Sequence, residues 1–395
     1  MMTSRGSQAV ILGLIGLTLV KLLVASVWGW TNDIPQTLVQ AKAFLESPHI
    51  LRPSVPSIFP LGYYVLATAP LVASLWTGLS YAFWIKVPAI LADLVIALAL
   101  RVMPRGGDRV AFLYMVNPVS FLLAVYHGQL HTAATAGAVL AYWYAERRQD
   151  VRAAVALGLA ASVRQHFGLL ILPLVLARRP RWRSLLLSFA LVVVLANLTL
   201  LGTYRTGIMA SPVWAYGAWG YGMLLLQGPR LLSVLGVSWM ASVTAGVNHA
   251  LQLHGPKLYW IWTALFWGWT WHRHQRRQAS DLWRSALVFL LGLYAISPGF
   301  GVQWLIWALP FWLLVNRREA VRYSILAGLF LAGSYWQWSL NAKYGVESIT
   351  ANLSLLQRVD LIGVFLVGVC GLLTWLFYVR ATWRLARALP STPFG

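Results

Sequence analysis

Long apolar stretches, each about as long as a membrane's hydrocarbon core is thick, alternate along this chain with short clusters of arginine. Hydrophobic residues make up 59% of the chain and charged residues only 10%, whereas soluble globular domains have about 25% charged residues. The pattern therefore predicts an all-α, polytopic membrane protein that forms one integral membrane domain over residues 1–395.

The charge is strongly one-sided, with 31 lysines and arginines against 10 acids and a formal net charge of +21. We expect the basic clusters to lie in cytoplasmic turns, where positive residues are enriched and anionic lipid headgroups attract them. This distribution predicts membrane lipids and no nucleic acid as partners. The clusters are Arg101/Arg105/Arg109, Arg147/Arg148/Arg152, Arg178/Arg179/Arg181/Arg183, Arg273/Arg276/Arg277/Arg284, Arg317/Arg318/Arg322 and Arg380/Arg384/Arg387.

Placing every cluster on the cytoplasmic side predicts about twelve crossings, with both ends of the chain in the cytoplasm. Residues 31–82 then form a first outer loop with a membrane-surface helix near Leu61–Leu79, and residues 204–256 form a second outer segment with an embedded helix. Residues 380–395 form a basic cytoplasmic tail. The expected spans cover residues 9–28, 83–103, 110–126, 131–146, 152–177, 185–203, 257–272, 284–297, 303–316, 320–336 and 358–379.

The stretch 152–177 begins and ends at basic clusters, so it must cross twice or not at all. Arg164, Gln165 and His166 lie at its middle. We expect two short helices that meet at a polar break facing a cavity, because irregular backbone at membrane depth is tolerated only there. A guanidinium at such a break suits a phosphate group, since its planar fork matches phosphate oxygens. His166 could share this role or pack.

Ionisable groups within apolar spans are costly and therefore candidates for function. Lys86 and Asp93 lie seven residues apart on one expected helix face. The two side chains either pair with each other or neighbouring helices to fix packing, or one of them lines a site.

Two expected outer turns are rich in polar side chains. The turn 126–131 contains His127, Gln129 and His131, and its composition favours sugar or lipid-phosphate contact. Two histidines four residues apart without a third ligand do not predict a zinc site. A second turn, 297–304, ends in Gln303 and Trp304, which could face the same site.

Asp33 is the acid that directly follows the first apolar run. Glu46 and Glu347 are the other acids expected on the outer side, so a carboxylate at this lipid–water boundary has few rivals. It is a candidate catalytic base, and its alternative role is that of a helix cap or headgroup-facing acid.

In their order, these landmarks resemble the GT-C superfamily of polytopic glycosyltransferases. The resemblance covers about residues 20–315 and rests on Asp33, Phe59-Pro60-Leu61-Gly62-Tyr63-Tyr64, Lys86–Asp93, Asn117-Pro118, His127 with Gln129, Arg164-Gln165 with Pro173, and Ser297-Pro298 with Gln303-Trp304 through Pro310. The chain departs from the family pattern at His131, Arg164 and Phe59.

The resemblance implies an inverting transfer of a hexose, with mannose weakly favoured, from a polyprenyl-phosphate donor to a lipid-linked or glycan acceptor. Asp33 would be the base, and Arg164, helped by Arg205, Arg230 or Lys257, would hold the phosphate. No cofactor is required, and a divalent metal is left open. The expected location is the inner membrane of a bacterium or the endoplasmic reticulum of a eukaryote.

Other classes stay open at this point. A transporter or flippase of a lipid-linked saccharide would need polar residues spread through a midplane cavity, and usually repeated halves. A polysaccharide polymerase or ligase, or a non-catalytic partner of a larger assembly, would also suit an outer site.

Overall fold

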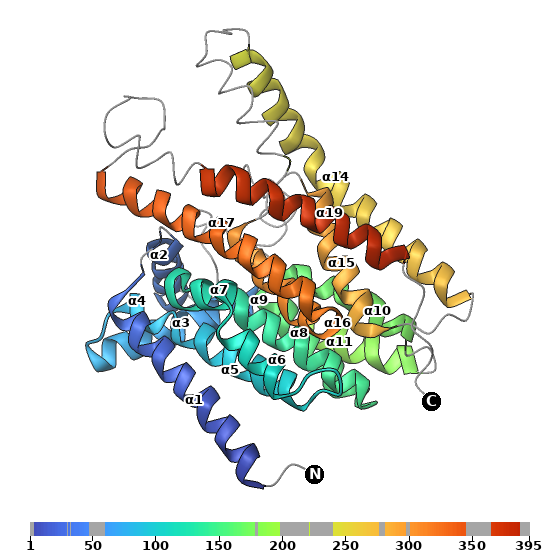
Figure 1. The fold of residues 1–395 in the computed structure, drawn as a ribbon, viewed down its shortest axis with the longest axis horizontal. Coiled ribbons are helices and arrows are strands. Elements are labelled where there is room, and N and C mark those ends of the chain that lie inside the picture. The colour runs from blue at the N-terminus through green and yellow to red at the C-terminus, as the bar shows by residue number, and fades with distance from the viewer. Residues whose placement is uncertain are drawn as a thin grey trace. The chain divides into compact units, whose positions relative to one another are not determined.

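The computed structural model describes residues 4–29, 31, 33–46, 60–177, 181–197, 221, 240–275, 281–297, 301–344 and 365–387. Every regular element in these ranges is a helix, and no strand occurs among them. The predicted all-α class is therefore confirmed (Figure 1).

The chain divides into two compact units. The first comprises Met1–Ser211 with Asp281–Ala286 and Ile306–Ala320, and the second comprises Pro212–Ser280, Leu287–Leu305 and Val321–Gly395.

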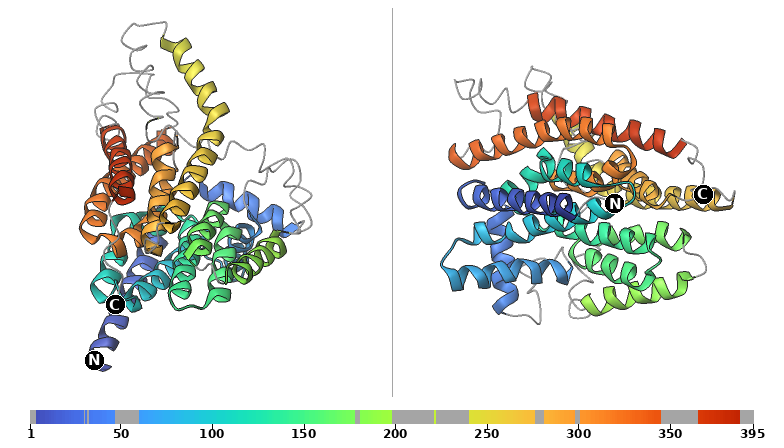
Figure 2. Two further views of the ribbon diagram at one scale, coloured as in Figure 1. Left: turned by 90° about the vertical axis from the view of Figure 1, so that its right-hand side faces the viewer. Right: turned by 60° about the horizontal axis from the view of Figure 1, so that its bottom comes forward.

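The first unit holds the helices of the amino-terminal half, and among them α8, α9 and α11 pack side by side (Figure 2). Its elements are α1 (Ser4–Val27), α2 (Asp33–Glu46), α3 (Leu61–Thr77), α4 (Tyr81–Trp84), α5 (Val87–Val102), α6 (Asp108–Met115), α7 (Pro118–Phe121), the π-helix η1 (Leu122–His127), α8 (His131–Glu146), α9 (Asp150–Val163), the 3-10 helix η2 (Gln165–Leu170), α10 (Ile171–Ala177), α11 (Trp182–Asn197) and most of α16 (Leu305–Val315).

The second unit is built from longer helices of the carboxyl-terminal half. Its elements are α14 (Met240–Gln275), most of α15 (Leu282–Ile296), the 3-10 helix η5 (Val302–Trp304), most of α17 (Arg317–Tyr344), the π-helix η6 (Leu366–Cys370) and α19 (Gly371–Arg387).

Three described helical segments are long and apolar enough to cross a membrane, namely Gly6–Val27, Tyr81–Val102 and Leu366–Arg387. A fourth would be added if Asp108–Met115 and Pro118–His127, which meet at a 49° bend, form one span. Several shorter apolar helices accompany them. The chain therefore has membrane-protein character, and the count of about twelve crossings stays a prediction.

The expected segments agree with the described helices at several places. A helix begins at Leu61, α8 covers residues 131–146 as expected, and α9 ends at the predicted polar break. Near residue 256, where an outer segment is expected to end, α14 is one helix of 36 residues that continues through Pro256. A helix can continue through a proline at the loss of one backbone hydrogen bond, so the end of the outer segment at residue 256 stays a prediction.

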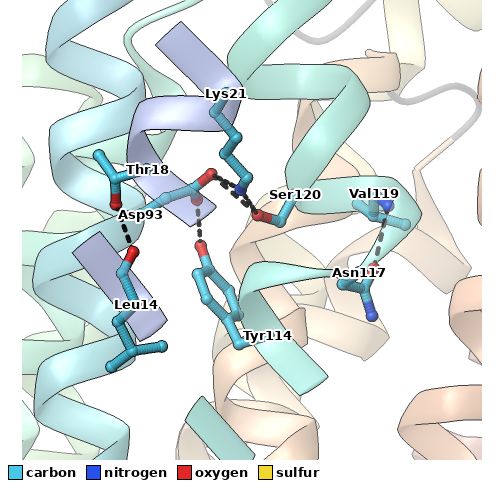
Figure 3. A network of polar contacts seen from close by, with 8 residues as sticks. All are labelled: Leu14, Thr18, Lys21, Asp93, Tyr114, Asn117, Val119 and Ser120. Atoms are coloured by element: carbon cyan, nitrogen blue, oxygen red, sulfur yellow. Dashed lines mark hydrogen bonds and ion pairs between the residues drawn. The ribbon is translucent and has the colours of Figure 1, made fainter. Parts of the chain in front are cut away.

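A buried polar network fastens α1 to its neighbours (Figure 3). Nζ of Lys21 donates to Oδ2 of Asp93 (2.6 Å) and to Oγ of Ser120 (2.7 Å). The hydroxyl of Tyr114 donates to Oδ1 of Asp93 (2.7 Å). Asp93 thus pairs with α1 rather than with Lys86, so the reading of these groups as partners to neighbouring helices describes it correctly.

The basic turns of the first unit are joined by polar contacts. Arg105 pairs with Asp281, and Nε1 of Trp283 donates to Glu146 at 3.2 Å. Arg181 lies 3.9 Å from Asp150. These contacts bring turns that are far apart in the sequence to one end of the unit, as expected if they share one side of a membrane.

Candidate active site

The turn after α1 and the turn before α8 meet. Oγ1 of Thr31 donates to the backbone carbonyl of His127 at 3.3 Å, and the rings of Trp28 and Tyr126 are in edge contact at 5.2 Å between centroids. Asp33 lies in the first turn of α2, where the positive end of the helix dipole favours a carboxylate.

One oxygen of Asp33 is held by two side chains from the 126–131 turn. Nε2 of Gln129 donates to Oδ2 at 2.8 Å, and Nε2 of His127 lies 3.0 Å from the same oxygen. Oδ1 has no hydrogen bond to any described residue, and one third (33%) of the Asp33 side chain is exposed. The carboxylate is therefore oriented through one oxygen, and part of its side chain is exposed.

Arg164 reaches Asp33 through Gln129. Its Nη2 donates to Oε1 of Gln129 at 2.7 Å, so the amide links the guanidinium to the carboxylate. The guanidinium carbon lies 4.9 Å from the centre of the Tyr63 ring, whose hydroxyl is 2.9 Å from Oγ1 of Thr37 in α2. Because α2 carries both Asp33 and Thr37, the contacts form a closed circuit.

The predicted break delivers Arg164 to this circuit. The residue has an extended backbone (φ −142°, ψ 109°) between the end of α9 and the start of η2. Its side chain is buried, which is costly for a guanidinium unless charged or polar groups surround it. Arg164 thus lies behind Gln129, in the interior of the unit.

Burial raises the pKa of the Asp33 carboxyl, but other effects outweigh it. The hydrogen bond and charge of His127, the charge of Arg164 and the hydrogen bond from Gln129 lower the pKa, and the net result is a pKa below the ordinary value of 3.8. Asp33 is consequently a carboxylate at neutral pH, able to accept a proton but not to donate one.

Trp307 of α16 contacts three ring side chains that lie close to Gln129 or Arg164 in the sequence. Its ring stacks on His131 at 5.4 Å and 14°, and it also contacts His166 (5.2 Å) and Phe167 (5.1 Å). Nε1 of Trp307 donates to Nδ1 of His131 at 2.9 Å. Nε2 of His131 is buried without a hydrogen-bond partner among the described residues.

Lys86 holds the turn that precedes Asp33. Its Nζ donates to the backbone carbonyls of Ala25 (3.1 Å), Trp28 (2.7 Å) and Gly29 (2.9 Å). Carbonyls at the end of a helix lack partners within the helix, so the ammonium caps α1. Gly29 has φ +99°, and a Cβ there would lie 2.7 Å from Cα of Tyr126, so a larger residue does not fit.

The structure brings most of the predicted site residues together. Asp33, His127, Gln129 and Arg164 are directly linked, and His131 and His166 follow through Trp307. Gln165, beside Arg164, is half-buried.

Other predicted residues are not joined to this site by the described contacts. Gln303 and Trp304 belong to the second unit, where the carbonyl of Trp304 accepts a hydrogen bond from Tyr294. Lys257 also belongs to that unit and lies 3.3 Å from His254. Arg205 and Arg230 lie outside the described residues.

Sequence reasoning gave no role to Thr37, Lys21 or Trp307. A lone lysine inside an apolar run was the available signal for Lys21, since an unpaired charge there is unfavourable.

No group of three or more His, Cys, Asp or Glu side chains suited to a metal occurs within the described ranges.

No family model, curated protein or solved structure matches this chain.

Proposed function

We propose that this protein is a membrane glycosyltransferase that transfers a hexose from a polyprenyl-phosphate donor to a lipid-linked or glycan acceptor, with Asp33 as the general base. The observation that supports it most directly is that the two carboxylate oxygens of Asp33 have different surroundings. Oδ2 is held by Gln129 and His127, whereas Oδ1 has no described partner.

This arrangement suits proton abstraction from an acceptor hydroxyl. The proton passes to Oδ1 of Asp33 while the hydroxyl oxygen attacks the anomeric carbon of the sugar. The bond from that carbon to the donor phosphate breaks, and its electron pair leaves with the polyprenyl phosphate. A base needs its lone pair fixed toward the proton that it accepts, and the two contacts on Oδ2 would supply that orientation.

Arg164 would act electrostatically from behind Gln129. Preorganised positive charge in a site with little water stabilises negative charge that develops in a transition state. Its guanidinium is buried and already bonded to Gln129, so we assign it the stabilisation of the Asp33 carboxylate first and of the leaving phosphate second. Mannose is the hexose we favour.

The position of the site along α8 supports transfer on the non-cytoplasmic side. His131 begins α8, and Glu146, whose turn contacts Trp283 among the basic turns, ends it. Sixteen residues extend about 24 Å at a helical rise of 1.5 Å per residue. The site therefore lies roughly one hydrocarbon-core thickness from the turns expected in the cytoplasm.

The test is transfer by the purified chain in detergent, with labelled polyprenyl-phosphate mannose and glucose as donors and short glycolipids as acceptors. We expect product from the wild type and none from Asp33→Asn, which keeps the size of the side chain. Glu46→Gln is the matched control, because Glu46 is an exposed acid at the other end of α2. Equal product from Asp33→Asn and the wild type would remove Asp33 as the base, and movement of lipid-linked sugar across vesicles without transfer would favour a flippase.

A further inference from the structure

A cavity of about 450 Å³ lies at the basic end of the first unit. It is formed by the turn before α6, the start of α6, the end of α16 and the start of α17. Its lining residues are Arg105, Arg109, Leu313, Leu314, Asn316, Arg317 and Arg318. Two arginine clusters that are distant in the sequence thus line one hollow, although nothing in the proposed transfer reaction uses it.

The lining has positive charge and no acid of its own. Arg105 is neutralised by Asp281, which is outside the lining. Glu319, in the first turn of α17, is buried and also outside it. Nε of Arg317 is buried without a hydrogen-bond partner among the described residues. A buried N–H of a guanidinium favours a hydrogen-bond acceptor, so this half-buried side chain suits a ligand that can accept.

The backbone adds further donors. Asn316 caps α17, because its Oδ1 accepts from the N–H of Glu319 (3.2 Å) and its carbonyl accepts from the N–H of Ala320 (3.0 Å). The N–H groups of Arg317 and Arg318 precede these bonds and have no backbone partner in the described part of the chain. The amino end of a helix, with its free N–H groups and positive dipole, attracts anions.

We propose that this cavity binds a phosphate group through Arg317, Arg318, Arg109 and the start of α17. Guanidinium groups form paired, charge-assisted hydrogen bonds with phosphate oxygens. The group could belong to the headgroup of an anionic lipid, whose acyl chains Leu313 and Leu314 would tolerate, or to a soluble phosphate compound. This site is distinct from Asp33 and does not depend on the transfer reaction.

The test uses the full chain in nanodiscs of neutral phosphatidylcholine. In one arm, fluorescent phosphatidylglycerol is titrated into the disc; in the other, inorganic pyrophosphate is added as a competitor and as a ligand on its own. Arg317→Gln/Arg318→Gln removes two lining charges. Arg152→Gln/Arg183→Gln is the matched control, because it removes two exposed arginines that do not line the cavity.

We expect Arg317→Gln/Arg318→Gln to weaken binding at least about tenfold and the control to match the wild type. If phosphatidylglycerol binds and pyrophosphate does not displace it, the ligand is a lipid phosphate. If pyrophosphate binds to the wild type and this binding is lost in Arg317→Gln/Arg318→Gln, the ligand is a soluble phosphate compound. Equal binding by all three proteins, or equal weakening in the control, overturns the proposal. If the double variant fails to fold, the exposed Arg109→Gln is used and must weaken binding for the proposal to stand.

Discussion

Nζ of Lys21 lies 2.6 Å from Oδ2 of Asp93, and their side chains are only 2% and 0% exposed. Removing one partner of a buried ion pair leaves an uncompensated charge, which costs about 3–5 kcal/mol. We therefore expect Lys21→Met and Asp93→Asn each to lower the stability of the folded chain in detergent, as measured by thermal unfolding. The double variant Lys21→Met/Asp93→Asn should lose less stability than the sum of the single variants, because it removes both charges together and keeps an amide oxygen that can accept from Tyr114. Additive losses would contradict the pairing.

We expect Lys86 to affect the conformation of the turn before Asp33 more than the stability of the whole fold. Lys86→Met removes hydrogen bonds to the carbonyls of Ala25, Trp28 and Gly29. We expect faster amide hydrogen exchange in residues 28–34, with exchange in α8 unchanged, because the cap acts on that turn alone. Lys86→Arg keeps a donor and should restore part of the protection. Equal loss of protection throughout the first unit would indicate a general packing role instead.

The pKa of Asp33 sets a pH window for stability. Since the folded pKa lies below 3.8, interactions of the carboxylate stabilise the fold above that pH and are lost as pH falls through the folded value. The stability difference between wild type and Asp33→Asn should therefore be constant from pH 5 to 8 and shrink below about pH 4. Thermal unfolding of the two proteins across this range measures it. A difference that already shrinks as pH falls from 7 to 5 would contradict the lowered pKa of the carboxyl.

Variants of Arg164 and Tyr63, whose side chains are in contact, distinguish an electrostatic role of Arg164 from a packing role. Arg164→Gln removes the donor to Gln129, and a hydrogen bond to a charged group is worth about 1.5–3 kcal/mol. We expect kcat/KM to fall about 10–150-fold for donor and acceptor alike, because the guanidinium acts first on the Asp33 carboxylate through Gln129. Tyr63→Phe keeps the ring beside the guanidinium and removes the contact with Thr37, so it should stay within about fivefold of the wild type. Similar losses in both variants would point to packing.

The sequence predicted the polar break at Arg164 because a polar step interrupts an apolar stretch that is bounded by basic clusters. Charge placed the 126–131 turn and Asp33 on the same side of the membrane, but their direct contact was not predicted. The sequence did not predict that Gln129 would lie between Asp33 and Arg164. Which side chains contact each other depends on the rotation and tilt of the helices, and the periodicity of the sequence does not determine these. The partner of Lys21 could not be predicted either, because Asp93 lies 72 residues away in the sequence on another helix.

Variants of Trp307 and His131 test whether the hydrogen bond between these two side chains stabilises the fold. Nε1 of Trp307 donates to Nδ1 of His131 within a stacked pair, and both residues are buried. His131→Phe keeps an aromatic ring but leaves the indole N–H without its acceptor, which costs about 1–3 kcal/mol. Adding Trp307→Phe removes the unsatisfied donor, so the double variant should lose less stability than the sum of the single variants. The coupling is read from a double-mutant cycle of thermal unfolding. A coupling energy near zero would mean that the hydrogen bond does not hold the two rings together.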